Sequence, residues 1–285
     1  MSSAKTPLTG FALALVALTA ACATGPSKED AELARAMEAA LAPASPEERA
    51  AANRADPLTR ANFWSREYQK DPTDAAVTLE FSDALRGIGS HARAAEVLST
   101  TLVVHPGNTD IMMALGRLHM AGGDHPAALR VFDRAAATSP DRADTWASLG
   151  TAFDQLQQHA QAQAAYQRAL MLEPQRTTTL TNYGLSLLLS GDLKGAEAQL
   201  RTAAANPDAN ARVHENLALV LGLQGRFEEM KEVSRAAAPA SVSEQNAALV
   251  RALVQPTRSY EALTNSSADA ATEDGGRRQL RRSIN

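Results

Sequence analysis

Apolar residues between positions 75 and 244 recur at helical spacing, in segments separated by short turns. A one-sided apolar pattern of this kind predicts amphipathic helices that are joined in antiparallel pairs. Aromatic residues make up only 4% of the chain and alanine dominates the apolar residues, which argues against a β-sandwich or β-barrel. The sequence therefore predicts an all-α fold. The expected turns between paired helices contain Gly89, Gly123, Gln157, Gly191 and Gly225.

The helical pattern repeats every 34 residues, as the prolines at 72, 106, 140 and 174 show. Each 34-residue stretch of this pattern is called a row. Within each row a large apolar residue directly precedes a small one, as in Leu149-Gly150. A second small residue, such as Ala162, follows twelve positions after the first small residue. Small residues at a helix crossing allow the two backbones to approach closely, so we expect these positions to pack together. The positions are Gly116, Gly150 and Gly184 on the first helices, and Ala128, Ala162 and Ala196 on the second helices.

The row from 143 to 176 states the repeat most fully, and it resembles the tetratricopeptide repeat (TPR). The residues that carry the resemblance are Trp146, Leu149, Gly150, Phe153, Ala162, Tyr166, Ala169 and Pro174. The resemblance implies five repeats that stack into a right-handed α-solenoid with a concave face, because one helical hairpin cannot bury its own apolar stripe. The expected repeats are 75–108, 109–142, 143–176, 177–210 and 211–244.

TPR proteins build their concave face mainly from the first helix of each repeat. Carried onto this chain, the resemblance implies a peptide-binding groove on Arg117, Thr151, Asn182, Leu185, Asn216 and Leu219. An asparagine amide can donate to and accept from the backbone of an extended peptide, whatever its side chains. The alternative is that both asparagines bond within the solenoid and the leucines pack in its seam. The Lys/Asn clamp of TPR proteins that bind chaperone tails is absent, so such tails are not the expected ligand.

The N-terminus has the pattern of a signal peptide, expected to span residues 1–21. Lys5 precedes an apolar run from Phe11 to Ala21 that is too short to cross a bilayer, and the run ends at Cys22, the chain's one cysteine. This ending resembles the bacterial lipobox, which implies acylation of Cys22 and attachment to membrane lipid. The absence of aspartate after the cysteine favours the outer membrane, facing the periplasm. The alternative is ordinary cleavage after Ala21, which would leave a free thiol.

Segments of other composition flank the repeats. Residues 22–56 are expected to form a loosely packed tether with short helical stretches, and residues 57–74 an N-terminal capping helix that carries Trp64. A C-terminal capping helix is expected over 245–257. The polar remainder, 258–285, reads as a disordered tail, although its arginines could instead contact an anionic surface.

Little in the sequence points to catalysis. The chain has 28 basic and 32 acidic residues, an acidic balance that argues against nucleic-acid binding. His91, His125 and His159 occupy the same place in three successive rows, which indicates packing rather than a metal site, since neighbouring rows lie about 10 Å apart. No phosphate-binding glycine loop or nucleophile motif occurs. We therefore expect no enzyme, no cofactor and no metal.

A more specific resemblance concerns the chain as a whole. An acylated N-terminus, a spacer, a lone front helix and about five repeats resemble the TPR lipoproteins of the tight-adherence (Tad, Flp pilus) secretion system, the TadD family. Segments 182–192 and 215–229 are especially similar to that family. The resemblance implies a non-enzymatic scaffold that helps a secretin, or another pilus component, to assemble or localise. Alternatives are an adaptor for periplasmic cell-wall enzymes and a pilotin-like factor of another type IV pilus.

Overall fold

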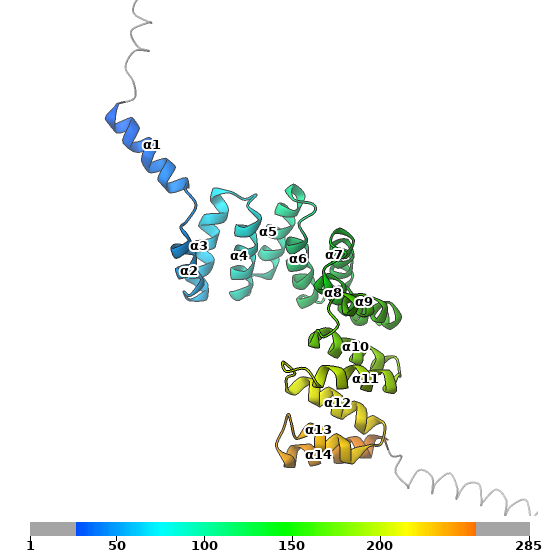
Figure 1. The fold of residues 1–285 in the computed structure, drawn as a ribbon. Coiled ribbons are helices and arrows are strands. Elements are labelled where there is room, and N and C mark those ends of the chain that lie inside the picture. The colour runs from blue at the N-terminus through cyan, green and yellow to red at the C-terminus, as the bar shows by residue number, and fades with distance from the viewer. Residues whose placement is uncertain (1–26, 255–285) are drawn as a thin grey trace, which may run out of the picture. The chain divides into compact units, whose positions relative to one another are not determined.

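The computed structural model describes residues 27–254, and this part of the chain is helical and contains no β-strand. The predicted all-α fold class is confirmed. The chain divides into two compact units, Met1–Val97 and Leu98–Asn285, each of which is described by itself. Figure 1 shows that short turns connect successive helices.

The first unit begins with well-capped helices. Ser27 and Ser45 each form a capping box, in which the serine hydroxyl accepts from a backbone amide and an acid three residues later accepts from the serine amide. The α5 helix, His91–Val104, contains the point at which the two units divide. The other helices of this unit are α1 (Lys28–Leu41), α2 (Pro46–Asn53), α3 (Pro57–Lys70) and α4 (Ala75–Gly87).

The second unit is a stack of helical hairpins. Each helix from α6 to α14 contacts the next one along the chain, and α10 also contacts both α8 and α12, so the first helices of successive hairpins lie side by side. The bounds are α6 (Thr109–Ala121), α7 (His125–Thr138), α8 (Ala143–Gln155), α9 (His159–Leu172), α10 (Thr177–Leu189), α11 (Leu193–Ala204), α12 (Ala211–Leu223), α13 (Phe227–Ser234) and α14 (Ala240–Val254).

The turn within each hairpin reverses the chain through one residue in the left-handed region. Gly123, Gly191 and Gly225 have φ values of 77°, 89° and 79° there, and Gly89 has 76° in the first unit. The same position in the hairpin of α8 and α9 holds Gln157, with φ 59°, and it is the only non-glycine residue with positive φ in the range 27–254. All five predicted turn residues therefore adopt the same backbone conformation.

Three predicted packing glycines each lie against one large side chain of the partner helix. A Cβ atom on Gly150 would lie 2.6 Å from Cε1 of Tyr166, and one on Gly184 would lie 2.7 Å from Cγ of Leu200. Gly116 faces the ring of Phe132 in the same way. The predicted alanines, Ala128, Ala162 and Ala196, are fully buried one turn before these large residues. At each crossing, a glycine on the first helix thus faces a large residue on the second helix, and this large residue lies four positions after the buried alanine.

The structure differs from the sequence-based expectation at both ends of the repeats. Residues 42–56 pack on α3 instead of forming a loose spacer: α2 contacts α3, and Ala52 is buried. The last described helix begins at Ala240, inside the expected fifth repeat, because α13 is short and ends at Ser234.

Several expectations concern residues that the structure does not describe. The expected signal peptide, the candidate lipid site Cys22, the end of the expected C-terminal cap and the tail 258–285 all lie outside residues 27–254. Within 27–254, no helix has the length and apolarity that crossing a bilayer requires.

Candidate functional site

A hollow of about 260 Å³ lies on the second unit, across the first helices of three successive hairpins. Its lining is polar, with four hydroxyls, one amide, one carboxylate and two guanidinium groups. The residues come from α6 (Met113, Arg117), α8 (Asp144, Ala147, Ser148, Thr151) and α10 (Thr178, Thr179, Asn182), together with Arg176 just before α10.

Three of the six predicted groove residues meet in this hollow. Arg117 is exposed, whereas Thr151 and Asn182 are half-buried, and the Asn182 amide lies 3.5 Å from the Thr151 hydroxyl. The hollow brings together side chains that are 31 to 34 residues apart in sequence because equivalent positions of stacked repeats align.

The other three predicted groove residues do not line the hollow. Leu185 is half-buried and Leu219 is 38% exposed. Asn216 is half-buried, and its amide nitrogen is buried and has no hydrogen-bond partner. Asn182 and Asn216 therefore differ in their surroundings, although they occupy equivalent repeat positions.

Asp154 joins three helices close to the hollow. Its carboxylate accepts from Ser186 on α10 at 2.7 Å and from Tyr166 on α9 at 3.0 Å, and His159 lies 2.9 Å away. Burial raises the pKa of Tyr166, which keeps its hydroxyl protonated as a donor. The Tyr166 hydroxyl also lies 3.3 Å from Thr151, which lines the hollow. This network fixes one wall of the hollow to the helices behind it.

Arg142 binds two acidic groups at the hollow. Its guanidinium donates to both oxygens of Asp144, at 3.1 and 2.8 Å, and to Asp110 at 2.7 Å. The hydrogen bonds from Arg142 hold the pKa of Asp144 below its usual value, and those from both acids raise the pKa of Arg142. Asp144 is therefore an ionised carboxylate whose oxygens are already bound.

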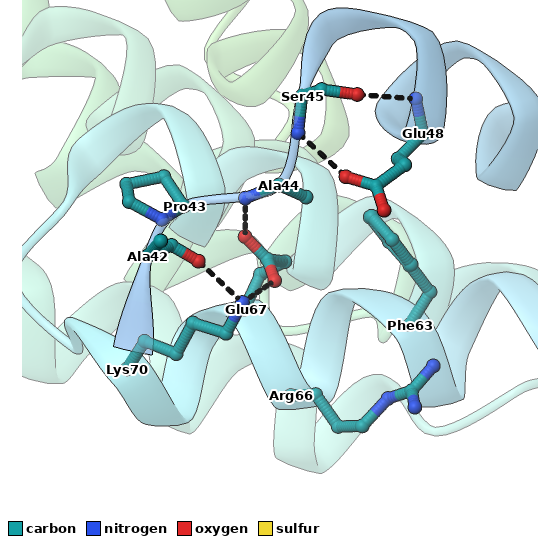
Figure 2. A pocket seen from close by; sticks show the side chains of 9 residues that line it. All are labelled: Ala42, Pro43, Ala44, Ser45, Glu48, Phe63, Arg66, Glu67 and Lys70. Carbon is teal, nitrogen blue, oxygen red and sulfur yellow. Dashed lines mark hydrogen bonds and ion pairs between the residues drawn. The ribbon is translucent and has the colours of Figure 1, made fainter. Parts of the chain in front are cut away.

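A second hollow, of about 530 Å³, lies in the first unit between α3 and the segment that connects α1 to α2. The Ala44 amide donates to Glu67 at 2.8 Å, and the Lys70 ammonium donates to the Ala42 carbonyl at 2.8 Å and lies 2.5 Å from Glu67. Figure 2 shows Glu67 and Lys70 directed at the connecting segment, whereas Arg66 extends away from it. These contacts fasten the segment to α3, so we assign them a structural role.

The three aligned histidines have different surroundings, which does not fit the common packing role that their spacing suggested. His91 is exposed, His125 has a buried ring nitrogen without a partner, and His159 pairs with Asp154. Among residues 27–254 no cluster of His, Cys, Asp and Glu could hold a metal ion.

Among the groups in the hollow that sequence reasoning missed are Arg176 and Thr179. Both sit at the start of α10, where Arg176 is the N-cap residue and Thr179 is fully buried with an unpartnered hydroxyl. Neither belongs to the positions by which TPR grooves are recognised. The nearest signal is the run of three threonines, 177 to 179, which lacks a preceding Ser, Asp or Asn cap.

Comparison with protein families supports the repeat assignment. A family described as tetratricopeptide repeat matches residues 79–143 and 148–211. This part of the chain is similar to the TPR family. TPR proteins generally serve as scaffolds for protein interactions, so the chain has the architecture of a binding scaffold. No curated protein matches the sequence.

Solved structures confirm the TPR fold. A TPR protein from Parabacteroides merdae ATCC 43184 superposes with a TM-score of 0.60 at 15% identity, covering 72% of this chain and 84% of that one. YrrB, described as a TPR protein with an unusual peptide-binding site, gives 0.52 at 19% identity, covering 66% and 98%. The MamA protein gives 0.52 at 19% identity, covering 62% and 94%. At these identities the likeness concerns the fold alone.

Proposed function

We propose that this chain is a lipid-anchored TPR scaffold that holds an extended segment of a partner protein on the face formed by α6, α8 and α10. The observation that carries the proposal is the meeting of Arg117, Thr151 and Asn182 in one polar hollow across three repeats. The Thr151 hydroxyl and the Asn182 amide can both donate and accept hydrogen bonds, and such groups suit the backbone and polar side chains of an extended peptide.

The biological setting that we propose is assembly of a Tad/Flp-type pilus machine at the periplasmic side of the outer membrane. Its support is the sequence resemblance of segments 182–192 and 215–229 together with the lipobox-like Cys22. The partner in this setting is the secretin, or another component of the same machine, which the scaffold would hold while the ring assembles or is localised.

Affinity isolation from cell envelopes tests the partner. The wild-type chain should co-isolate secretin subunits, and a variant with Arg117→Ala and Asn182→Ala should lose them while it remains folded by circular dichroism. Recovery of cell-wall hydrolases or synthases in place of secretin would support the adaptor function instead. Undiminished secretin capture by the variant would place the binding surface elsewhere.

The anchor is tested separately at Cys22. Replacement by serine should abolish incorporation of labelled palmitate and release the protein from membranes into the soluble periplasmic fraction. A Cys22→Ser variant that still takes up lipid, or that fractionates as the wild type does, would contradict the proposed anchor.

A further inference from the structure

The hollow across α6, α8 and α10 offers more hydrogen-bond donors than acceptors. Arg117 and Arg176 contribute guanidinium groups, which donate and cannot accept. The Asn182 amide has two N–H groups, and its contact with Thr151 is long, at 3.5 Å. A donor-rich site of this kind suits a ligand group that only accepts hydrogen bonds.

The start of α10 adds further donors at the same place. Its N-cap residue, Arg176, makes no side-chain cap bond, which is also true of the N-cap residues of α8, α9 and α13. Uncapped amides at a helix N-terminus favour an anion. Independently, Thr179 is fully buried at this end of the helix, lines the hollow and has a hydroxyl without a hydrogen-bond partner. An unpartnered buried hydroxyl is costly unless a bound group uses it.

Two nearby acids, Asp144 and Asp110, are both bound by Arg142, and of the two only Asp144 lines the hollow. At the start of α10, Asp208 accepts from the Thr177 hydroxyl at 2.5 Å and does not line the hollow.

Glu173 lies 2.8 Å from Arg176, but their side chains are 52% and 33% exposed, so water screens this ion pair. Arg176 can therefore leave Glu173 and bind the carboxylate of a ligand. At about 260 Å³, the hollow is smaller than the roughly 300–1,000 Å³ typical of sites for whole small molecules. Its size suits a single side chain.

We infer that this hollow is a subsite for one carboxylate side chain, Asp or Glu, of the extended partner segment, held by Arg117, Arg176 and the start of α10. The inference rests on the proposed protein-binding function and adds the chemistry that the partner must carry. An acid in the middle of a segment is meant, because the proposed function lays an extended segment across α6, α8 and α10.

Selection from a random peptide library displayed on phage tests this inference on the full mature chain. Peptides that bind should carry Asp or Glu at one fixed position. The strongest binder is then synthesised with Glu or Gln at that position, and the two affinities are compared by fluorescence anisotropy. The Gln peptide should bind about tenfold more weakly, the effect of losing one charge-assisted hydrogen bond.

Variants of the two arginines assign the effect to the hollow. Arg117→Gln and Arg176→Gln should each weaken binding of the Glu peptide and leave binding of the Gln peptide nearly unchanged. The matched control is Arg168→Gln, because Arg168 is an exposed arginine on α9 outside the hollow and its loss should affect neither peptide.

The outcomes separate the inference from the function on which it rests. Selected peptides without a preferred acid would overturn the carboxylate subsite and leave the scaffold function intact. Acidic peptides whose binding ignores both arginine variants would also overturn it, since the acid would then bind elsewhere. Selection of no peptide at all would count against the proposed groove itself.

Discussion

Single residues set the spacing of each hairpin in the second unit. Gly116, Gly150 and Gly184 leave room for Phe132, Tyr166 and Leu200, respectively. Because protein interiors are close-packed, the space left by the missing side chain of the glycine must match the volume of the large side chain that fills it from the other helix. The pairs therefore constrain each other, and a change on one side should be felt at the crossing.

Replacement of Gly150 by leucine should destabilise the second unit by roughly 1 to 3 kcal/mol or more, because the new side chain would overlap Tyr166. Urea denaturation followed by circular dichroism measures the loss. Gly107→Leu is the control, since a Cβ atom there meets nothing within 4 Å and the change should be nearly neutral. Equal stability of the two variants would contradict the packing described for Gly150.

Replacement of Gln157 by glycine should stabilise the chain by roughly 0.5 to 1 kcal/mol, because φ is 59° at this turn and side chains are strained there. The measurement is the midpoint of thermal unfolding. An exposed residue of the α9 interior, Ala164, serves as the comparison: Ala164→Gly should lower the midpoint, since glycine weakens a helix interior. If both changes lower it, Gln157 is not strained.

Replacement of Thr179 by valine should raise the free energy of unfolding by roughly 1 kcal/mol, because it removes a buried hydroxyl that has no partner. Thr145 is equally buried, but its hydroxyl donates to the Arg142 carbonyl at 2.7 Å, so Thr145→Val should destabilise. Denaturation curves of both variants and the wild type, recorded in parallel, measure the two changes in the free energy of unfolding, which should have opposite signs. The same sign for both would refute the assignment of Thr179 as unpartnered.

The repeat pattern was sufficient to predict the turns but not the environment of each polar group. All five turn residues were identified because they occupy the same place in the 34-residue period, at which four of the five rows have a glycine. Asn216 was predicted to face a peptide, yet its amide nitrogen is buried, whereas Asn182 reaches the hollow. Equivalent positions do not specify burial, which depends on the side chains contributed by neighbouring repeats.

At the scale of elements, the connection between α1 and α2 is held by α3. Glu67 is buried and lies 23 residues from Ala44 in the sequence, and its carboxylate accepts a hydrogen bond from the Ala44 amide. The sequence 42–56 contains few large apolar residues, so composition predicted a loose spacer. The contacts that order it join side chains to backbone atoms, and a hydrophobic pattern carries no sign of such contacts.

Acid should release this connection. Burial opposes ionisation of Glu67, but the hydrogen bonds from Lys70 and Ala44 outweigh it and hold the pKa of Glu67 below its usual value. The stability that Glu67 contributes is thus complete above its unfolded pKa and is lost as the pH falls through the lower folded value. The protection factor of the Ala44 amide against hydrogen exchange should therefore fall as the pH drops below the unfolded pKa of glutamate, about 4.3.

A variant of Glu67 checks the cause. Glu67→Gln should lower stability at neutral pH by roughly 1 to 3 kcal/mol and make exchange at Ala44 fast at every pH. Glu47→Gln is the control, because Glu47 is exposed on α2. In this variant the hydrogen exchange of the Ala44 amide should match that of the wild type at each pH. An acid-induced change that persists in Glu67→Gln would assign the titration to another group.

At the scale of the whole molecule, the last described helix covers the end of the repeat stack. Ala247 and Val250 of α14 belong to the same buried cluster as Leu221, Phe227 and Met230. Stacked repeats depend on such a cover, because the outer face of an end repeat is otherwise apolar. The sequence did predict a capping helix here, although it placed the start later than Ala240.

A chain that ends at Pro239 should bind the dye ANS, melt at a lower temperature and aggregate, because loss of α14 exposes this cluster. A chain that ends at Val254 is the control, since it keeps α14 and removes only residues beyond the described part. Equal melting temperatures for both truncations would show that α14 is dispensable as a cover.

The bonds that Asp154 receives from α9 and α10 have a consequence for recognition. Helices tied together by an internal carboxylate cannot easily slide past one another, so the surface they present is already set before a guest arrives. Most of the ordering entropy would then fall on the incoming segment alone. The sequence of the bound segment, more than any rearrangement of the helices that bind it, should therefore determine the lifetime of the complex.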